Sequence, residues 1–333
     1  MITSSALFLL FAFSLVIVYD KMVLRQLPRA IRAWLYGTAL FSLAIGINIV
    51  QLCSFLFVPI SRRLVWDINA RGAQTMWWVM QYIFERRHSA KITFSGDKLP
   101  HNESAIVISN HRSFTDFYML HSVAVRKSML PHVKYFAKDS LKYIPFFGFG
   151  MWLMGMLFIK RNWTQDEVRL KKTFNAIKQY RAPVWVVNFL EGTRMTPQKV
   201  REGQKFSKER GLPILQNLLV PRTKGFIACL SQLRDTHVKF VYDFTIAYRH
   251  VTKGIQLPPN LVQVHSYSNL SPPWSFHVHV RRYAIEDLPR DEENIAEWVK
   301  ERFVEKDAIL EDMKIHWTKS ERLGEVRVEK YFK

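Results

Sequence analysis

The feature that most restricts the fold of this chain is an uncharged apolar run over residues 38–60. A helix needs about 20 such residues to cross a bilayer, so this run is long enough. Residues 1–19 are also uncharged, and their apolar part, residues 6–19, is borderline in length. No basic segment precedes that part and no small-residue cleavage site follows it, which argues against a cleaved signal peptide. Residues 1–60 are therefore predicted to be a membrane anchor made of two apolar segments.

Basic residues lie on both sides of the second run, with Arg29 and Arg32 before it and Arg62 and Arg63 after it. The positive-inside rule then fits a two-pass anchor and a shallow hairpin equally. Residues 61–89 contain Met76-Trp77-Trp78 close to basic residues, a pattern typical of an amphipathic helix lying in the head-group region. An ordinary core helix is the alternative.

The chain carries a formal net charge of +20, and its first 60 residues hold only four basic side chains and one acidic one. Most of the basicity therefore belongs to the globular part, where it favours anionic partners. Nucleic acid would be an odd partner for a chain with two membrane runs, so we expect an anionic membrane surface and phosphorylated ligands. The two cysteines, Cys53 and Cys229, lack metal-ligand spacing and fit a reducing compartment.

Beyond residue 89, short β-rich runs alternate with longer helical stretches. The predicted strands cover residues 91–94, 105–108, 135–137, 156–159, 184–189, 240–246 and 276–282, and the predicted helices cover 113–125, 165–179 and 292–310. This order predicts an α/β fold, with a central mostly parallel sheet flanked by helices and preceded by the N-terminal membrane-anchoring helices. Residues 90–290 would form the main α/β domain, and residues 291–333 a C-terminal helix followed by a frayed, charged tail.

Polar clusters follow two of the predicted strands, and ligands of open α/β sheets bind beyond the carboxyl ends of strands. His111 comes just after the strand at 105–108, and Glu191-Gly192-Thr193-Arg194 comes just after the strand at 184–189. Asp116 lies five positions after His111. If Ser113 caps the next helix, Asp116 takes the acidic place of a capping box. Asp116 could also hold one nitrogen of the His111 ring and leave the other as a general base. No G-x-S-x-G nucleophile motif occurs, so a His–Asp pair here would suit deprotonation of a substrate hydroxyl.

Other features are interpreted more plainly. His277 and His279 alternate with apolar residues, so they are expected on the wet face of a half-buried strand, and no metal site is predicted. The apolar stretch 146–158 is too short to cross a bilayer and is expected to pack inside or to line an acyl-chain channel.

Four ordered blocks resemble those of the glycerolipid or lysophospholipid acyltransferase family. Asn110-His111 with Asp116 is similar to its N-H-x-x-x-x-D block, and residues 134–161, ending in Lys160-Arg161, to its second. Phe189-Leu190-Glu191-Gly192-Thr193-Arg194 resembles the F-P-E-G-T-R block, with leucine where proline is usual. The fourth block, Pro221-Arg222-Thr223-Lys224-Gly225-Phe226, is most similar to the eukaryotic branch that includes 1-acylglycerol-3-phosphate and lysocardiolipin acyltransferases.

The resemblance implies transfer of a fatty acyl chain from acyl-CoA, as co-substrate and without a cofactor, to the free hydroxyl of a lysophospholipid. It implies that His111 is the general base and that Asp116 orients it. The residues implied to bind substrate are Lys160, Arg161, Glu191, Gly192, Thr193, Arg194, Pro221 and Lys224. Among these, Glu191 could instead be a structural partner of Arg194.

The acceptor expected first is 1-acylglycerol-3-phosphate, giving phosphatidic acid, with lysophosphatidylinositol or lysocardiolipin as the alternative. An endoplasmic-reticulum membrane with the catalytic domain facing the cytosol is expected from the eukaryotic character of the fourth block. The alternative from a different class is a non-catalytic protein that binds anionic membranes.

Overall fold

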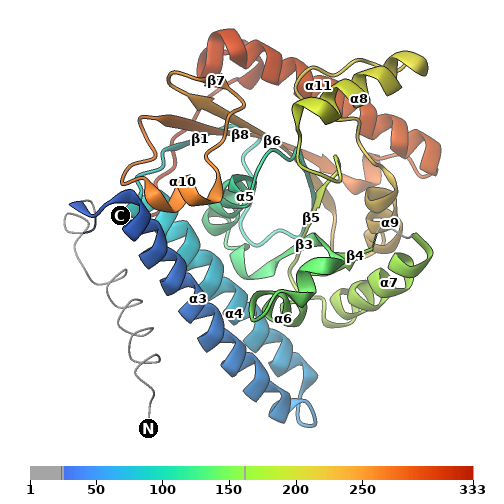
Figure 1. The fold of residues 1–333 in the computed structure, drawn as a ribbon. Helices are drawn as coiled ribbons and strands as arrows, with labels where there is room; N and C mark the ends of the chain where they lie inside the picture. The colour runs from blue at the N-terminus through green and yellow to red at the C-terminus, as the bar shows by residue number, and fades with distance from the viewer. Residues whose placement is uncertain (1–23, 25, 161–162, 333) are drawn as a thin grey trace.

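The computed structural model describes residue 24 and residues 26–160 and 163–332. Within these residues the fold is built on one sheet with the order β1-β8-β6-β2-β5-β3-β4, and β7 pairs with β6 at its end (Figure 1). The strands are β1 (Ile92–Gly96), β2 (Ala105–Ser109), β3 (Val133–Lys138), β4 (Leu157–Ile159), β5 (Trp185–Phe189), β6 (Phe240–His250), β7 (Gly254–Ile255) and β8 (Trp274–Ala284). Only the pairings of β6 with β8 and β7 are antiparallel, so the predicted mostly parallel α/β sheet is confirmed.

Helices cover both faces of this sheet, and each face has its own apolar core. The first core joins the sheet to α4 and α5, with α3 and α6 packed against it. The second joins the sheet to α7, α9 and α11. The helices are α3 (Arg29–Ser54), α4 (Arg62–Tyr82), α5 (Thr115–Arg126), α6 (Phe147–Leu153), α7 (Trp163–Tyr180), α8 (Pro197–Glu209), α9 (Lys224–Leu233), α10 (Leu261–Ser266) and α11 (Glu292–His316).

All seven predicted strands are present, each within a few residues of its expected bounds. The three predicted helices correspond to α5, α7 and α11, and α11 continues six residues beyond the expected end at residue 310. The strands were recognisable because β2 and β5 are buried along their whole length and read as continuous apolar runs.

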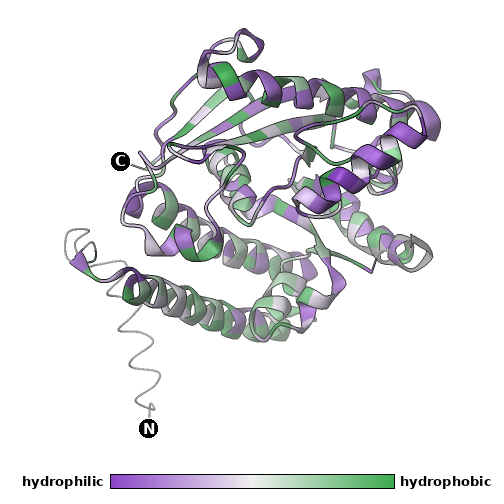
Figure 2. Ribbon diagram, turned by 45° about the horizontal axis from the view of Figure 1, so that its top comes forward, coloured by the Kyte–Doolittle hydropathy of each residue, from purple (hydrophilic) through white to green (hydrophobic). Residues whose placement is uncertain are grey.

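The apolar run at 38–60 belongs to α3 and the short helical turn after it. Among the described residues, the segment Arg29–Phe57 is the one helix that is long and apolar enough to cross a membrane, and little of it is buried (Figure 2). The apolar run at 1–19 lies outside the described residues. Helix α4 lies beside α3 and buries Met76, Trp77 and Met80 in the core, while Trp78 is partly exposed. The division of the chain into anchor, interfacial helix and catalytic domain stays a prediction.

The expected wet face of β8 is wrong. His277 and His279 are both buried, and Ser95 Oγ of the neighbouring β1 lies 2.8 Å from His277 Nε2 and 2.9 Å from His279 Nδ1. Trp317, directly after α11, packs over His277 with ring centroids 6.4 Å apart. Burial lowers the pKa of His277 to about 3 and that of His279 to about 4, because a dry environment disfavours the charged ring.

The expected frayed tail is also wrong over its described part. Arg327 and Phe94 of β1 exchange two backbone hydrogen bonds of 2.7 and 2.8 Å, so the tail covers the outer edge of the sheet. The Arg126 side chain on α5 donates to the backbone carbonyl of Glu329 at 2.9 Å. The reason is that β1 is an edge strand with unpaired backbone groups, which a neighbouring extended segment can satisfy.

Candidate active site

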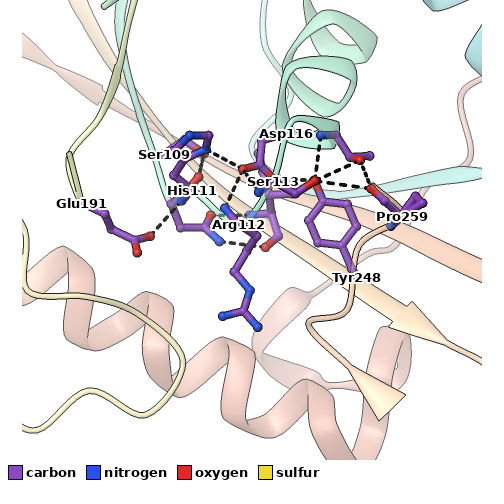
Figure 3. A network of polar contacts seen from close by, with 11 residues as sticks. Ser109, His111, Arg112, Ser113, Asp116, Glu191, Tyr248 and Pro259 are labelled. Carbon is purple, nitrogen blue, oxygen red and sulfur yellow. Dashed lines mark hydrogen bonds and ion pairs between the residues drawn. The ribbon is translucent and has the colours of Figure 1, made fainter. Parts of the chain in front are cut away.

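The site begins where β2 ends, at the centre of the sheet. Asn110 is fully buried, and its amide both donates to the carbonyl of Ile246 at 2.9 Å and accepts from the N–H of Ile246 at 2.8 Å. This pair ties the turn after β2 to β6 as a backbone ladder would. The next residue, His111, is thereby fixed at the carboxyl edge of the sheet (Figure 3).

His111 and Asp116 form the pair that the spacing predicted. Nδ1 of His111 lies 2.7 Å from Oδ2 of Asp116, and the side chains are 15% and 0% exposed respectively. An ionised carboxylate can only accept hydrogen bonds, so Nδ1 carries a proton, and in the neutral ring the lone pair is then on Nε2. No described residue hydrogen-bonds to Nε2. The ring stacks on Phe189 with centroids 4.2 Å apart, which fixes its plane.

The carboxylate of Asp116 is held by three further donors. Its Oδ2 accepts from the backbone N–H groups of Arg112 at 2.6 Å and Ser113 at 2.9 Å. Its Oδ1 accepts from the hydroxyl of Tyr248 on β6 at 2.5 Å (Figure 3). The helix-capping role and the dyad role are therefore compatible, since one carboxylate fills both. The Ser113 hydroxyl accepts from Thr115 N at 3.0 Å rather than from Asp116 N, so the expected capping box is only half formed.

The Glu191 carboxylate holds the backbone of His111 in place. Oε1 accepts from the His111 N–H at 2.8 Å and Oε2 from the Leu219 N–H at 3.2 Å, and the side chain is buried. Burial raises the pKa of Glu191 to about 8, although the two backbone hydrogen bonds favour its charged form. Its contacts are with these backbone groups rather than with Arg194, so the expected alternative pairing is not what the structure contains.

The segment after Glu191 lies beside His111. The Met195 N–H donates to the His111 carbonyl at 3.1 Å, and Lys199 Nζ donates to the Thr193 hydroxyl at 2.6 Å. Gly192 has φ +65°, and a Cβ there would lie 3.0 Å from Cδ of the Arg222 side chain, so glycine suits this position on both counts. Arg194 is exposed.

Of the remaining predicted site residues, the structure describes Lys160, Pro221 and Lys224. Lys160 follows β4, three strand positions away from β2, which corresponds to about 14 Å along the sheet. Arg161 lies outside the described residues. Pro221 precedes Arg222, whose N–H donates to the Leu190 carbonyl at 2.7 Å, so the fourth block meets the third. Lys224 starts α9 and lines a cavity of about 380 Å³ between α7 and α9.

Two residues of this network were missed from the sequence. Tyr248 is the last residue of the continuous buried run 241–248 on β6. Arg112 donates to the Gln256 carbonyl at 2.7 Å beside the dyad. Burial lowers the pKa of Arg112, and the carboxylates of Glu191 and Asp116 oppose that shift. The usable signal for Tyr248 was a hydroxyl-bearing side chain near the end of β6, but its position beside Asp116 depends on the strand order. Among the described residues no group of three or more His, Cys, Asp or Glu side chains could hold a metal ion.

Comparison with known proteins agrees with these blocks. A family model described as Acyltransferase matches residues 91–248, and one described as Acyltransferase C-terminus matches residues 271–318. The chain is 32% identical to the 1-acyl-sn-glycerol-3-phosphate acyltransferase 2 of Brassica oleracea, over 83% of this chain and 69% of that protein. It is 31% identical to the human 1-acyl-sn-glycerol-3-phosphate acyltransferase gamma, over 80% of this chain and 69% of that protein.

Among solved structures, the 1-acyl-sn-glycerophosphate acyltransferase PlsC of Thermotoga maritima aligns with 87% of this chain and 99% of its own, with 15% identity and a TM-score of 0.49. That likeness is too distant to bear on the site. The sequence relatives are close enough to assign the family: the chain belongs to the 1-acyl-sn-glycerol-3-phosphate acyltransferase family and is an acyltransferase.

Proposed function

We propose that this protein transfers a fatty acyl chain from acyl-CoA to the free hydroxyl of 1-acylglycerol-3-phosphate, giving phosphatidic acid. The observation that carries the proposal is the His111–Asp116 pair, whose orientation leaves Nε2 available at the carboxyl edge of the sheet. The relatives named for this substrate support the same acceptor. An endoplasmic-reticulum membrane, with the catalytic domain on its cytosolic side, is the setting we propose.

In this mechanism His111 Nε2 takes the proton of the acceptor hydroxyl as its oxygen attacks the thioester carbonyl carbon. A tetrahedral intermediate forms, and its collapse breaks the carbon–sulfur bond and expels the CoA thiolate. The proton on Nε2 then passes to that thiolate, which restores the neutral ring. Asp116 holds Nδ1–H throughout and stabilises the imidazolium while it exists.

Positioning residues keep this pair in one geometry. Glu191 fixes the His111 backbone, and Tyr248 holds the Asp116 oxygen that His111 does not use. Supporting contacts of this kind keep a catalytic side chain close to the position and orientation that the reaction requires. Glu191 would therefore act through His111, as a positioning residue, in addition to the substrate contact first expected.

For the acceptor phosphate we propose Arg194, since its loop is tied to the His111 carbonyl through Met195. A guanidinium can donate two parallel hydrogen bonds to phosphate. Gly192 and Thr193 would shape this loop, and Lys160 and Arg161 would also bind the phosphate. Pro221 would shape the loop on the donor side, and Lys224 would meet the CoA phosphates.

The test is release of CoA thiol by purified full-length protein in nanodiscs, with lysophospholipids of several head groups. We expect release that requires 1-acylglycerol-3-phosphate and falls at least about 1,000-fold in His111→Ala, a loss typical of removing a catalytic base. The matched control is His101→Ala, because His101 is exposed in the turn ahead of β2. Preference for lysophosphatidylinositol or lysocardiolipin would replace the proposed acceptor. No release with any acceptor, from protein that binds anionic vesicles, would favour the non-catalytic membrane-binding alternative.

A further inference from the structure

One short segment outside the catalytic network exposes an unusual amount of apolar surface. Between β3 and β4, Tyr143 is 73% exposed and Trp152 is 55% exposed, and Ile144 and Phe146 are also exposed. Single exposed apolar residues are ordinary, but several on one segment mark an interaction surface. We call Tyr143, Ile144, Phe146 and Trp152 the α6 patch. The sequence predicted that residues 146–158 pack inside or line a channel, and Phe146 and Trp152 do not pack inside.

The backbone holds the α6 patch in place. The Phe147 N–H donates to the Pro145 carbonyl at 2.6 Å, and the residue between them, Phe146, has φ 61° and ψ −48°. This is a γ-turn of the rare, strained type, and bulky residues adopt such a conformation only where the surroundings enforce it. A Cβ on Gly148 would lie 2.3 Å from the carbonyl oxygens of Leu141 and Lys142, so only glycine lets α6 pack this closely. The exposed rings therefore sit on a firm support.

The patch continues the apolar surface of α3. The Phe146 ring meets the ring of Phe41 on α3 edge-on, with centroids 5.4 Å apart, and both rings are partly exposed. Gly150 of α6 packs against Asn48 of α3, where a Cβ would lie 3.1 Å from the Asn48 amide nitrogen. Helices α3 and α6 are in contact. The exposed apolar residues of α3 and its following turn include Ile49, Leu52, Phe55 and Leu56.

Charge around the patch indicates what covers it. Lys138 and Lys160 are exposed at the ends of the paired strands β3 and β4. Lys142, whose charge is paired with Asp139 at 2.9 Å, lies over the Tyr143 ring at 4.9 Å. Tyrosine and tryptophan beside lysine are typical of protein surfaces seated at the head groups of anionic bilayers. We infer that the α6 patch is a second membrane contact, which dips into the head-group boundary of an anionic bilayer next to α3.

This contact fixes how the catalytic edge faces the membrane. The patch follows β3, and β3 is separated from β2, the strand that carries His111, by β5 alone. Because the carboxyl ends of parallel strands meet at one edge, the bilayer would lie along the edge that holds the dyad. A lysophospholipid could then present its hydroxyl to His111 while its acyl chain stays in the bilayer.

A depth-sensitive label tests the contact without using activity. On a Cys53→Ser background, with Cys229 buried, an environment-sensitive fluorophore is attached through Ile144→Cys in nanodiscs containing phosphatidic acid. Spin-labelled lipids should quench it at least about twofold, as they should a label placed through Leu56→Cys, which marks α3. The matched control is Ile315→Cys, an isoleucine 80% exposed on α11 at the other face of the sheet, and it should stay unquenched.

The outcomes are distinct. Quenching of the label at position 56 without quenching at position 144 would overturn the proposal. It would also be overturned if the fluorophore at position 144 reported an apolar environment in the absence of lipid, and did so more strongly at higher protein concentration, since a second copy of the chain would then cover the patch. A second measurement uses Ile144→Asp with Trp152→Asp. Activity on lysophospholipid embedded in vesicles should fall about tenfold, while activity on a short-chain, water-soluble lysophospholipid and the activity of Ile315→Asp should not change. If the wild type acts on neither substrate, the proposed function fails and the quenching result still stands.

Discussion

At the scale of single residues, the two oxygens of Asp116 have separate partners. Oδ2 receives the His111 ring and two backbone N–H groups, while Oδ1 receives the Tyr248 hydroxyl alone. A hydrogen bond to a charged group contributes about 1.5–3 kcal/mol, more than one between neutral groups. The tyrosine therefore limits both the rotation of the carboxylate and the negative charge that faces His111.

This arrangement predicts the effect of Tyr248→Phe. We expect kcat to fall about tenfold or more, with little change in KM, because the change acts on the base rather than on substrate binding. We also expect the acid limb of the pH–rate profile to move to higher pH, because a carboxylate that has lost a donor attracts the imidazolium more strongly.

The control for Tyr248→Phe is present on the same strand. Tyr242 lies on the same face of β6, and its hydroxyl donates to the Glu103 carboxylate at the opposite end of the sheet. Tyr242→Phe loses the same kind of hydrogen bond away from the site, so its pH–rate profile should match the wild type. An unshifted profile in Tyr248→Phe, or an equal shift in both variants, would contradict the positioning role.

The sequence allowed His111 and Asp116 to be identified because they are five residues apart, on a turn and the helix that follows it. Tyr248 is far from both in the sequence, and only the pairing of β2 with β6 brings it to Asp116. Glu191 was found as a motif member, but its contact with the His111 N–H depends on the pairing of β2 with β5. Local chemistry was thus predictable, and contacts between strands were not.

At the scale of elements, a buried ion pair connects α11 to β6. Lys306 is paired with Asp243 and donates to the Phe244 carbonyl at 2.9 Å, with both side chains almost fully buried. Burial lowers the pKa of Lys306 and raises that of Asp243, although each partner opposes the shift of the other. Removing either member would therefore leave the other charge buried without a partner, which is strongly destabilising.

We predict that Lys306→Ala destabilises the protein by about 3–5 kcal/mol, because it leaves the Asp243 carboxylate buried without its partner. The measure is the midpoint of thermal unfolding in detergent, read from tryptophan fluorescence. Lys306→Met combined with Asp243→Leu should regain most of the loss, since no charge is then left in the core. A double variant as unstable as Lys306→Ala would count against this account and point to packing around the lysine stem.

Strands were predicted correctly from the sequence where the hydrophobic pattern fitted only one structure. Continuous apolar runs identified β2 and β5, while β7, with two residues, left no pattern to read. Alternation on β8 was read as one dry and one wet face, which is the usual meaning in an antiparallel strand. That reading failed because α11 and Trp317 cover the second face, and Thr93 and Ser95 of β1 supply hydrogen bonds to the two histidines there.

At the scale of the whole molecule, several buried histidines make stability depend on pH. Burial lowers the pKa of His121 to about 3 and of His265 to about 4, in addition to the shifts at His277 and His279. Unfolding restores an ordinary value near 6.5, so below that pH the unfolded chain takes up protons that the folded protein does not. The stability that these buried, neutral histidines contribute is therefore fully present above about pH 6.5 and is lost as the pH falls toward 4.

His121 offers the sharpest test of this dependence. It is fully buried against Trp77, with ring centroids 4.8 Å apart, and neither ring nitrogen has a hydrogen-bond partner among the described residues. We expect the unfolding temperature to drop between pH 7.5 and pH 5.0, and to drop less in His121→Phe. His101→Phe changes an exposed histidine and should leave the drop as in the wild type. If His121→Phe does not reduce the drop, proton uptake at this residue is not its cause.

The pairing of β1 with β8 also has a consequence for how the protein is made. Ile92 pairs with Phe276, so β1 has no partner until almost all of the sheet has been synthesised. Helices α3 and α4 come before β1 in the chain and need no strand in order to form. During translation α3 and α4 therefore leave the ribosome before the sheet does, and α3, which is long and apolar enough to cross a membrane, can reach a bilayer while the catalytic sheet is still incomplete. The nascent chain would then be held at its membrane before it has a working site to bring there.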